Sequence, residues 1–253
     1  MNSIINIDTA NERRIILEKL DTWFDEHIAK NHVINTNKLV KISEFNINHF
    51  TLHYLAEFSF GEITPQSIAK TLLYPRVMGT SIATSFGQHF QTFCHEVLKA
   101  TPSIVPGIDI EFVDQVDGRH KWCQLKAGPT TLNKDDVPVI KDKFISIKHL
   151  ARTNKYNINV MSDCIVGVAY GNPLDLNNFY AEIAKDFPVI VGQDLWLRIT
   201  GDDEFYAAIL DKFRKIASKY RSASSLQSTV NQLSEYLREN PAEVGLNSGW
   251  PHS

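Results

Sequence analysis

The sequence predicts a mixed α/β fold, with a central mixed sheet flanked by helices and a helical N-terminal region. In the first third of the 253 residues, apolar side chains recur at helical spacing. The middle third contains short strand-like runs around an Asp-Gly turn, and helical spacing returns near the C-terminus. No repeat or linker divides the chain. We therefore expect a single domain, 1–253, made of a mainly helical region 1–75, a core 76–220, and a C-terminal helix and tail 221–253.

Composition narrows the class of protein. The hydrophobic fraction of 43% and the charged fraction of 22% are ordinary for a globular chain. No apolar run approaches the roughly 20 residues of a membrane span, so we expect no membrane partner. The N-terminus lacks a signal pattern, and three scattered cysteines are typical of a reducing cytoplasm. The net charge of −3 excludes nucleic-acid binding by bulk electrostatics and leaves only a local patch.

The N-terminal elements are expected to be helices. A helix over Asn11–Lys30 has Asp8 or Thr9 as its candidate cap. A second apolar stretch, Phe50–Phe60, ends at Gly61. Thr64-Pro65 begins another helix over Gln66–Leu73, and Tyr74-Pro75 should end it.

Strands and helices alternate in the rest of the chain. A long amphipathic helix should lead into a hairpin whose turn is Asp117-Gly118, the strongest short hairpin signal. The expected helices are Thr84–Ala100, Pro138–Lys155, Phe205–Tyr220 and Ser225–Arg238, and the expected strands are Gly107–Val116, Arg119–Ala127, Cys164–Tyr170, Pro188–Val191 and Leu195–Ile199.

The predicted hairpin separates polar from apolar side chains. A two-residue turn would place residue 116 opposite 119, 109 opposite 126, and 111 opposite 124. Cross-strand partners share a face of the sheet, so Asp109, Glu111, Gln124 and Lys126 should project from the same side. The opposite side is apolar and suits a core.

This polar face suits metal-dependent hydrolysis of a phosphodiester. Carboxylate and amide oxygens bind Mg²⁺, and a neighbouring lysine can position water or stabilise negative charge. A surface hairpin with a solvated Asp–Lys pair would show the same alternation, and that alternative stays open. The sharp strand end at Ala127-Gly128-Pro129 and the polar run Thr130–Lys134 favour the functional interpretation.

Asp109 with Gln124-Leu125-Lys126 resembles the motif of the PD-(D/E)xK nuclease superfamily. The sequence further resembles bacterial type II restriction endonucleases, including enzymes that cut GC-rich palindromes interrupted by a central base. The segments that carry this resemblance span roughly residues 60–210 and read YPRVMGTSIATSFGQHFQTF, GIDIEF, DGRHKWCQLKAGPTTLNKDD, HLART and IVGVAYGN.

The resemblance implies a PD-(D/E)xK core over residues 76–220, with Asp109 as a metal ligand and Lys126 as the catalytic lysine. Gln124 stands where the family usually has Glu or Asp, so one ligand charge is missing. Glu111, or Glu96 from the preceding helix, could supply that charge. The resemblance also implies a Mg²⁺ cofactor, double-stranded DNA as substrate, a homodimer and the bacterial cytoplasm. The N-terminal helices or Ser225–Arg238 could form the dimer surface.

A local positive patch favours DNA contact. Arg119–Lys155 holds nine lysines or arginines against three acids, a net charge of +6 beside the candidate catalytic strand. Arg76 and Ser81 precede a predicted helix, for which Thr84 is the expected N-cap. The candidate DNA-binding residues are Arg76, Ser81, Thr130, Thr131, Asn133, Lys134, Lys141, Lys148 and Arg152.

The sequence therefore favours a Mg²⁺-dependent type II restriction endonuclease. Two alternatives remain: a nuclease of the same superfamily that acts in repair or transposition, and a DNA-binding module that has lost catalysis. In the second alternative, glutamine at position 124 would reflect the loss of catalysis. The presence of Asp109 and Lys126 argues against that alternative.

Overall fold

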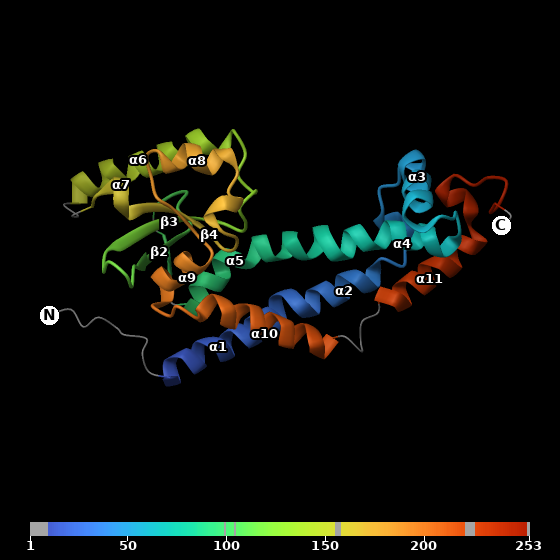
Figure 1. The fold of residues 1–253 in the computed structure, drawn as a ribbon, viewed down its shortest axis with the longest axis horizontal. Helices are drawn as coiled ribbons and strands as arrows, with labels where there is room; N and C mark the ends of the chain where they lie inside the picture. Colours follow the sequence, from blue (N-terminus) through green and yellow to red (C-terminus); the bar gives the residue numbers. More distant parts are fainter. Residues whose placement is uncertain (1–9, 99, 104, 155–157, 221–225, 252–253) are drawn as a thin grey trace. The chain divides into compact units, whose positions relative to one another are not determined.

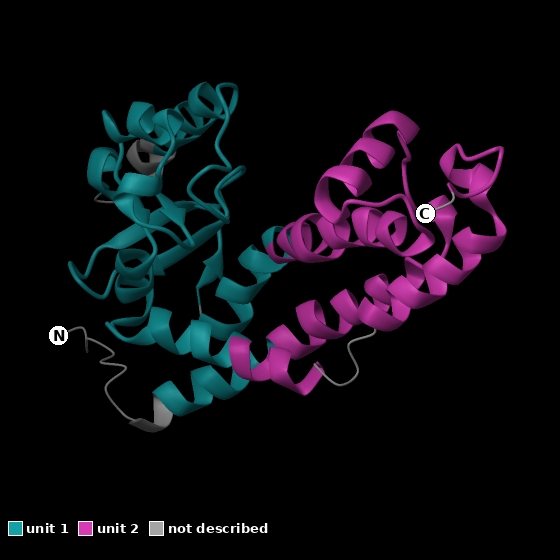
Figure 2. Cartoon of the chain, turned by 45° about the vertical axis from the view of Figure 1, so that its right-hand side comes forward, with its two compact units in different colours: residues 1–23, 87–213 teal, residues 24–86, 214–253 magenta. Residues whose placement is uncertain are grey.

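The computed structural model describes residues 10–98, 100–103, 105–154, 158–220 and 226–251. The chain forms two compact units that interleave along the sequence (Figure 2). Unit 1 comprises Met1–Trp23 and Gly87–Phe213, and unit 2 comprises Phe24–Phe86 and Arg214–Ser253. Each unit therefore combines segments that lie far apart in the sequence.

Unit 1 is built around a mixed five-stranded sheet with the order β1-β2-β3-β4-β5 (Figure 1). The strand pairs β1–β2 and β2–β3 are antiparallel, and β3–β4 and β4–β5 are parallel. The predicted mixed sheet with flanking helices is confirmed. The strands are β1 (Thr101–Pro102), β2 (Ile110–Val113), β3 (His120–Lys126), β4 (Cys164–Val168) and β5 (Val189–Val191).

Helices cover both faces of this sheet. On one face, α6 (Asp136–Asn154) and α8 (Asn178–Ala184) bury Phe144 and Tyr180 in a cluster with Val166 and Val168 of β4. On the other face, α9 (Gln193–Thr200) packs closely against β4 at Gly167. A Cβ atom at Gly167 would lie 2.8 Å from Cys123 Sγ and 2.9 Å from a Leu195 methyl group, so only glycine fits.

Two sequence predictions about these elements are wrong. Residues 195–199 form part of α9 and not a strand, because Leu195, Trp196 and Ile199 bury the helix on one side. Tyr74-Pro75 does not end its helix: α4 (Pro65–Pro75) continues through the π-helical turn η3 (Arg76–Ser81) into α5 (Ile82–Leu98). The wider turn accommodates the helix-interior proline.

Unit 2 is helical in the part that the structure describes. Its core joins α4 and α11 (Leu226–Glu239) through the side chains of Leu73, Val230 and Leu233. As the sequence predicts, Thr64 caps α4 in a reciprocal capping box, and Gly61 ends α3 (His49–Phe60) with a φ of 70°.

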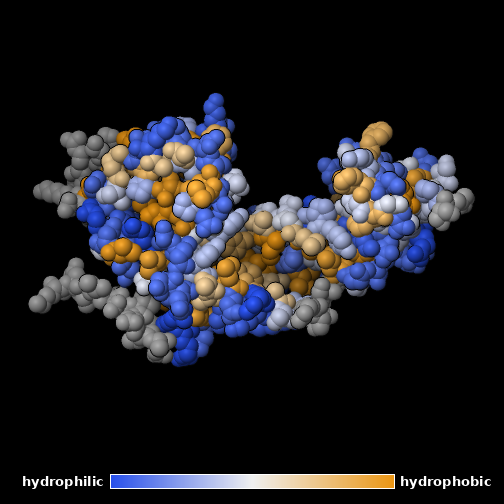
Figure 3. Space-filling view, viewed as in Figure 1, coloured by the Kyte–Doolittle hydropathy of each residue, from blue (hydrophilic) through white to orange (hydrophobic). Residues whose placement is uncertain are grey.

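Helix α3 leaves three aromatic side chains exposed at a spacing of four residues. The exposed fractions are 90% for Phe50, 64% for Tyr54 and 76% for Phe58. We call these three residues the α3 aromatic stripe. Apolar side chains also appear among the hydrophilic surface of both units in Figure 3.

The remaining elements complete the chain. The predicted N-terminal helix extends beyond Lys30 to Lys38, and its candidate caps Asp8 and Thr9 lie outside the described residues. None of the described helices is long and apolar enough to cross a membrane. These elements are α1 (Ala10–Phe24), η1 (Asp25–Ala29), α2 (Lys30–Lys38), η2 (Ile42–Glu44), α7 (Val160–Asp163), η4 (Pro173–Asp175), α10 (Phe205–Tyr220) and η5 (Pro241–Val244).

Candidate active site

The β2–β3 hairpin differs from the predicted register by two residues. Ile110 pairs with Cys123 and Glu111 with Trp122, so Asp109 lies opposite Gln124. The amide of Asp114 donates to the carbonyl of Arg119, which leaves residues 115–118 as a loop longer than the predicted turn. Because side chains alternate with a period of two, a shift of two residues preserves the faces. The polar and apolar sides of the hairpin therefore remain as the sequence predicts.

Asp109 and Gln124 are in direct contact. One carboxylate oxygen of Asp109, Oδ2, accepts hydrogen bonds from Gln124 Nε2 at 2.5 Å and from the Leu125 amide at 2.7 Å. Gln91 of α5 donates to the backbone carbonyl of Asp109 at 2.8 Å. Burial raises the pKa of Asp109, although the Leu125 amide and the positive charges of Lys143 and Lys126 act in the opposite direction.

Gln124 carries an oxygen suited to a hard cation. Its Oε1 atom is buried and has no hydrogen-bond partner among the described residues. A buried carbonyl without a partner is costly, and a bound ion would satisfy it. Asp109 and Gln124 thus fit a Mg²⁺ ion through oxygen ligands. Among the described residues, no group of three His, Cys, Asp or Glu side chains is placed to hold a metal ion.

Lys126 projects from the same face at the carboxyl end of β3. Its Nζ atom lies 3.5 Å from Asp136 Oδ1, and the Lys126 side chain is 20% exposed. The other carboxylate oxygen of Asp136 accepts from the Asn133 amide at 2.9 Å. In the sequence Asp136 counts only as an acid of the positive patch, and its contact with Lys126 appears in the structure.

Glu111 and Glu96, the two acids expected to replace the missing ligand charge, do not contact Asp109 or Gln124 through any hydrogen bond described for these side chains. Glu111 binds Ser103 Oγ at 2.6 Å and His120 Nε2 at 2.8 Å. Glu96 is exposed on α5, five residues after Gln91. A separation of five residues turns a helix by about 140°, so Glu96 and Gln91 lie on different faces of α5.

Several candidate DNA-binding side chains make contacts within unit 1. Thr131 Oγ1 donates to the Gly128 carbonyl at 2.9 Å, and Asn133 Oδ1 accepts from the backbone amides of residues 135 and 136 at the start of α6. Lys141 lies 2.7 Å from Asp186, whose hydrogen bond raises the lysine pKa. Thr130 and Lys134 are exposed.

For the other candidate DNA-binding residues, the structure gives only the element in which they lie or their exposure. Lys148 and Arg152 lie in α6, but their side chains are outside the described part of the structure. Arg76 is exposed and Ser81 partly exposed in the π-helical turn of unit 2. Thr84 lies inside α5, so the prediction that it caps a helix is wrong. The DNA contacts of this whole set stay predictions.

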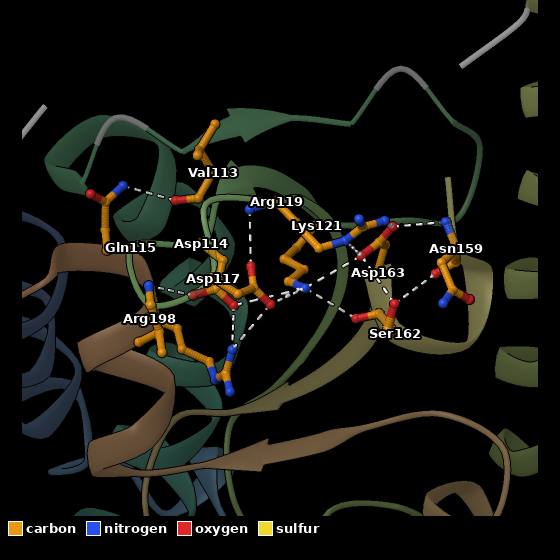
Figure 4. Close-up of polar contacts among 11 residues, drawn as sticks. Val113, Asp114, Gln115, Asp117, Arg119, Lys121, Asn159, Ser162, Asp163 and Arg198 are labelled. Atoms are coloured by element: carbon orange, nitrogen blue, oxygen red, sulfur yellow. Dashed lines mark hydrogen bonds and ion pairs between the residues drawn. The ribbon is translucent and has the colours of Figure 1, made fainter. Parts of the chain in front are cut away.

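Two residues of the predicted positive patch belong to an ionic cluster at the opposite end of β3 (Figure 4). Lys121 is only 2% exposed, and its Nζ atom lies 2.7 Å from Asp117 and 3.4 Å from Asp163. Arg119 donates through two nitrogens to Asp163. Lys121 is therefore not part of an exposed cationic face, and Arg119, whose side chain is 41% exposed, has its charge paired with Asp163. We call the six side chains Asp114, Asp117, Arg119, Lys121, Asp163 and Arg198 the ionic cluster.

The comparison with known families identifies the class of protein, and the mixed sheet with flanking helices is consistent with that class. The family model described as "Type II restriction endonuclease EcoO109I" matches residues 12–221, well over half of the chain. The chain belongs to this family, which implies a site-specific deoxyribonuclease that binds DNA. No curated protein matches the sequence.

Proposed function

We propose that this chain hydrolyses double-stranded DNA in a Mg²⁺-dependent reaction at the PD-(D/E)xK-type site formed by Asp109, Gln124 and Lys126. The observation that carries the proposal is the buried Gln124 Oε1 atom, which lacks a partner among the described residues and belongs to a side chain bonded to Asp109. A carboxylate and an amide oxygen can hold a Mg²⁺ ion, and a lysine can stabilise negative charge on the phosphate.

Each side chain has a separate task in this proposal. The Asp109 carboxylate and Gln124 Oε1 hold the ion. A bound Mg²⁺ ion supplies Lewis-acid stabilisation of the phosphoryl transition state and acidifies a bound water. Lys126 positions the attacking water and stabilises negative charge on the phosphate, while Asp136 holds the Lys126 ammonium at the end of β3.

Glu111 contributes little to this site in our proposal, because Ser103 and His120 already occupy its two carboxylate oxygens. Glu96 is also left out, since it shares no face of α5 with Gln91, the residue that contacts Asp109. The ion is therefore held with one negative charge fewer than in the usual motif, and binding should need a higher Mg²⁺ concentration.

The proposed substrate is a short GC-rich palindrome. A palindrome presents two equivalent strands, so two copies of the site related by a two-fold axis would cut both. We therefore propose a homodimer with the α3 aromatic stripe at its interface. The apolar face of α11 already packs on α4 within unit 2, whereas the stripe is exposed.

The stripe would supply part of the area that a dimer interface buries on each chain. Three covered aromatic side chains bury about 500 Å² in total, and a standard interface takes about 800 Å² from each partner. Replacing Phe50 and Phe58 with aspartate should convert a dimer to a monomer in light scattering. A doubly substituted chain that keeps the dimeric mass would remove the stripe from the interface.

Digestion of a sequenced plasmid tests the function directly. Discrete fragments that form only with Mg²⁺ support a restriction endonuclease, and sequencing their ends gives the site and the stagger. A smear would indicate a nonspecific nuclease of repair or transposition type. Binding without any cleavage would indicate a DNA-binding module.

A further inference from the structure

One face of α6 carries two charged side chains toward the candidate active site. Asp136 and Lys143 are seven residues apart, close to two helical turns, so they lie on the same side of the helix. Asp136 contacts Lys126, as described above. Lys143 instead crosses the loop that leads into β2, where Gly107 has a φ of 85°.

Gly107 makes room for the Lys143 side chain. A Cβ atom at Gly107 would lie 2.6 Å from Lys143 Cε and 3.2 Å from its Nζ atom. The Lys143 ammonium group is therefore beside the loop, two residues before Asp109 in the chain. Its position depends on a glycine that leaves this path open.

Lys143 differs from the neighbouring lysines in its contacts. Lys126 lies beside Asp136, and Lys141 beside Asp186. Within the described residues, the Lys143 ammonium has neither a hydrogen bond nor an ion pair, and the side chain is half-buried. The Lys143 ammonium thus lies unpaired, among the described residues, beside the loop that leads to Asp109.

We propose that Lys143 is a second lysine of the active site, which binds a backbone phosphate of DNA beside the ion. This inference rests on the proposed function. A half-buried ammonium beside the loop that leads to Asp109 offsets the repulsion between the Asp109 carboxylate and an arriving phosphate. The Lys143 ammonium also remains available for a phosphate, because none of the described acids forms an ion pair with it.

The test compares four chains on one DNA duplex of 30 base pairs that contains the mapped cleavage site. The chains are the parent, Lys143→Met, Lys143→Gln and Lys185→Met. Lys185 is the control because it loses the same charge from an exposed pair with Glu182. Methionine keeps the aliphatic stem over Gly107, and glutamine provides a second neutral variant if one of them fails to fold.

Two quantities are measured for each folded chain: the single-turnover cleavage rate with Mg²⁺, and the salt dependence of binding in metal-free buffer. Loss of one phosphate contact should reduce the slope of log K against log salt by about 0.9. We expect this change and at least a tenfold slower cleavage for the Lys143 variants, with the Lys185 variant within twofold of the parent.

An unchanged slope in the Lys143 variants overturns the inference, whatever the rate, since it leaves a packing role only. A reduced slope with a cleavage rate within twofold of the parent also overturns it, because the phosphate contact would lie outside the active site. Failure of the parent to cleave any DNA with Mg²⁺ is a different result, which refutes the proposed function itself.

Discussion

Replacing Lys121 with methionine should destabilise the protein far more than removing a surface lysine. The Lys121 ammonium lies 2.7 Å from Asp117, 3.4 Å from Asp163 and 3.9 Å from Asp114. Asp114 and Asp163 are at most 2% exposed, so water cannot replace the lost cation. The ionic cluster holds three cations and three carboxylates, and the variant leaves one uncompensated negative charge. Removal of one partner from a buried ion pair costs about 3–5 kcal/mol.

Urea unfolding of the parent, Lys121→Met and Lys185→Met measures this difference. Lys185 is 67% exposed and pairs with an exposed glutamate, so its loss should cost less than about 1 kcal/mol. Adding Asp117→Asn to Lys121→Met rebalances the charge and should recover part of the lost stability. A Lys121 variant as stable as the Lys185 variant would refute the view that buried charge holds this end of β3.

The remaining predictions concern pH and the metal site. Burial opposes ionisation of Asp163, but hydrogen bonds from Arg119 and the Asn159 amide outweigh it and lower the pKa from 3.8 to about 2. A depressed carboxyl pKa stabilises the fold above pH 3.8, and this contribution of about 2 kcal/mol is lost as the pH falls through 2. Asp163→Asn should therefore flatten the unfolding free energy between pH 4 and 2, and a slope equal to the parent's contradicts this. Gln124→Glu should stay active and lower the Mg²⁺ concentration needed for half-maximal cleavage. Gln124→Leu should lose most activity. If Gln124→Leu cleaves like the parent at low Mg²⁺, Gln124 is not a metal ligand. Glu111→Gln should change the cleavage rate by less than tenfold, and a larger loss would place Glu111 at the ion.

Local patterns predicted most helices and the two faces of the hairpin. The predicted register was wrong by two residues. Because this equals the side-chain period of a strand, the prediction of which side chains share a face was still correct. The turn itself was misplaced, since Asp114 closes the loop through backbone and side-chain hydrogen bonds that Asp117-Gly118 does not reveal. The same alternation also places Lys121 on the apolar side, which is inconsistent with a place in an exposed patch.

Other features depend on contacts that a single sequence does not display. The sequence predicts a strand at residues 195–199, because a short apolar run is typical of either a strand or a buried helix. In the structure these residues are helical, and Trp196 is buried in the packing of that helix. The contact of Lys126 with Asp136 and the path of Lys143 over Gly107 arise only when α6 covers the sheet. The interleaving of the two units is likewise a property of long-range packing.

Cleavage of a sequenced plasmid by Asp109→Ala tests the central claim most directly. The measurement is the rate of Mg²⁺-dependent fragment formation by the parent, by Asp109→Ala and by a control, Asp203→Ala, which removes an exposed acid of unit 1. The account predicts discrete fragments from the parent and the control, and no cleavage by Asp109→Ala despite retained DNA binding. Fragments formed by a folded Asp109→Ala chain at the parent's rate would contradict the assignment of the active site.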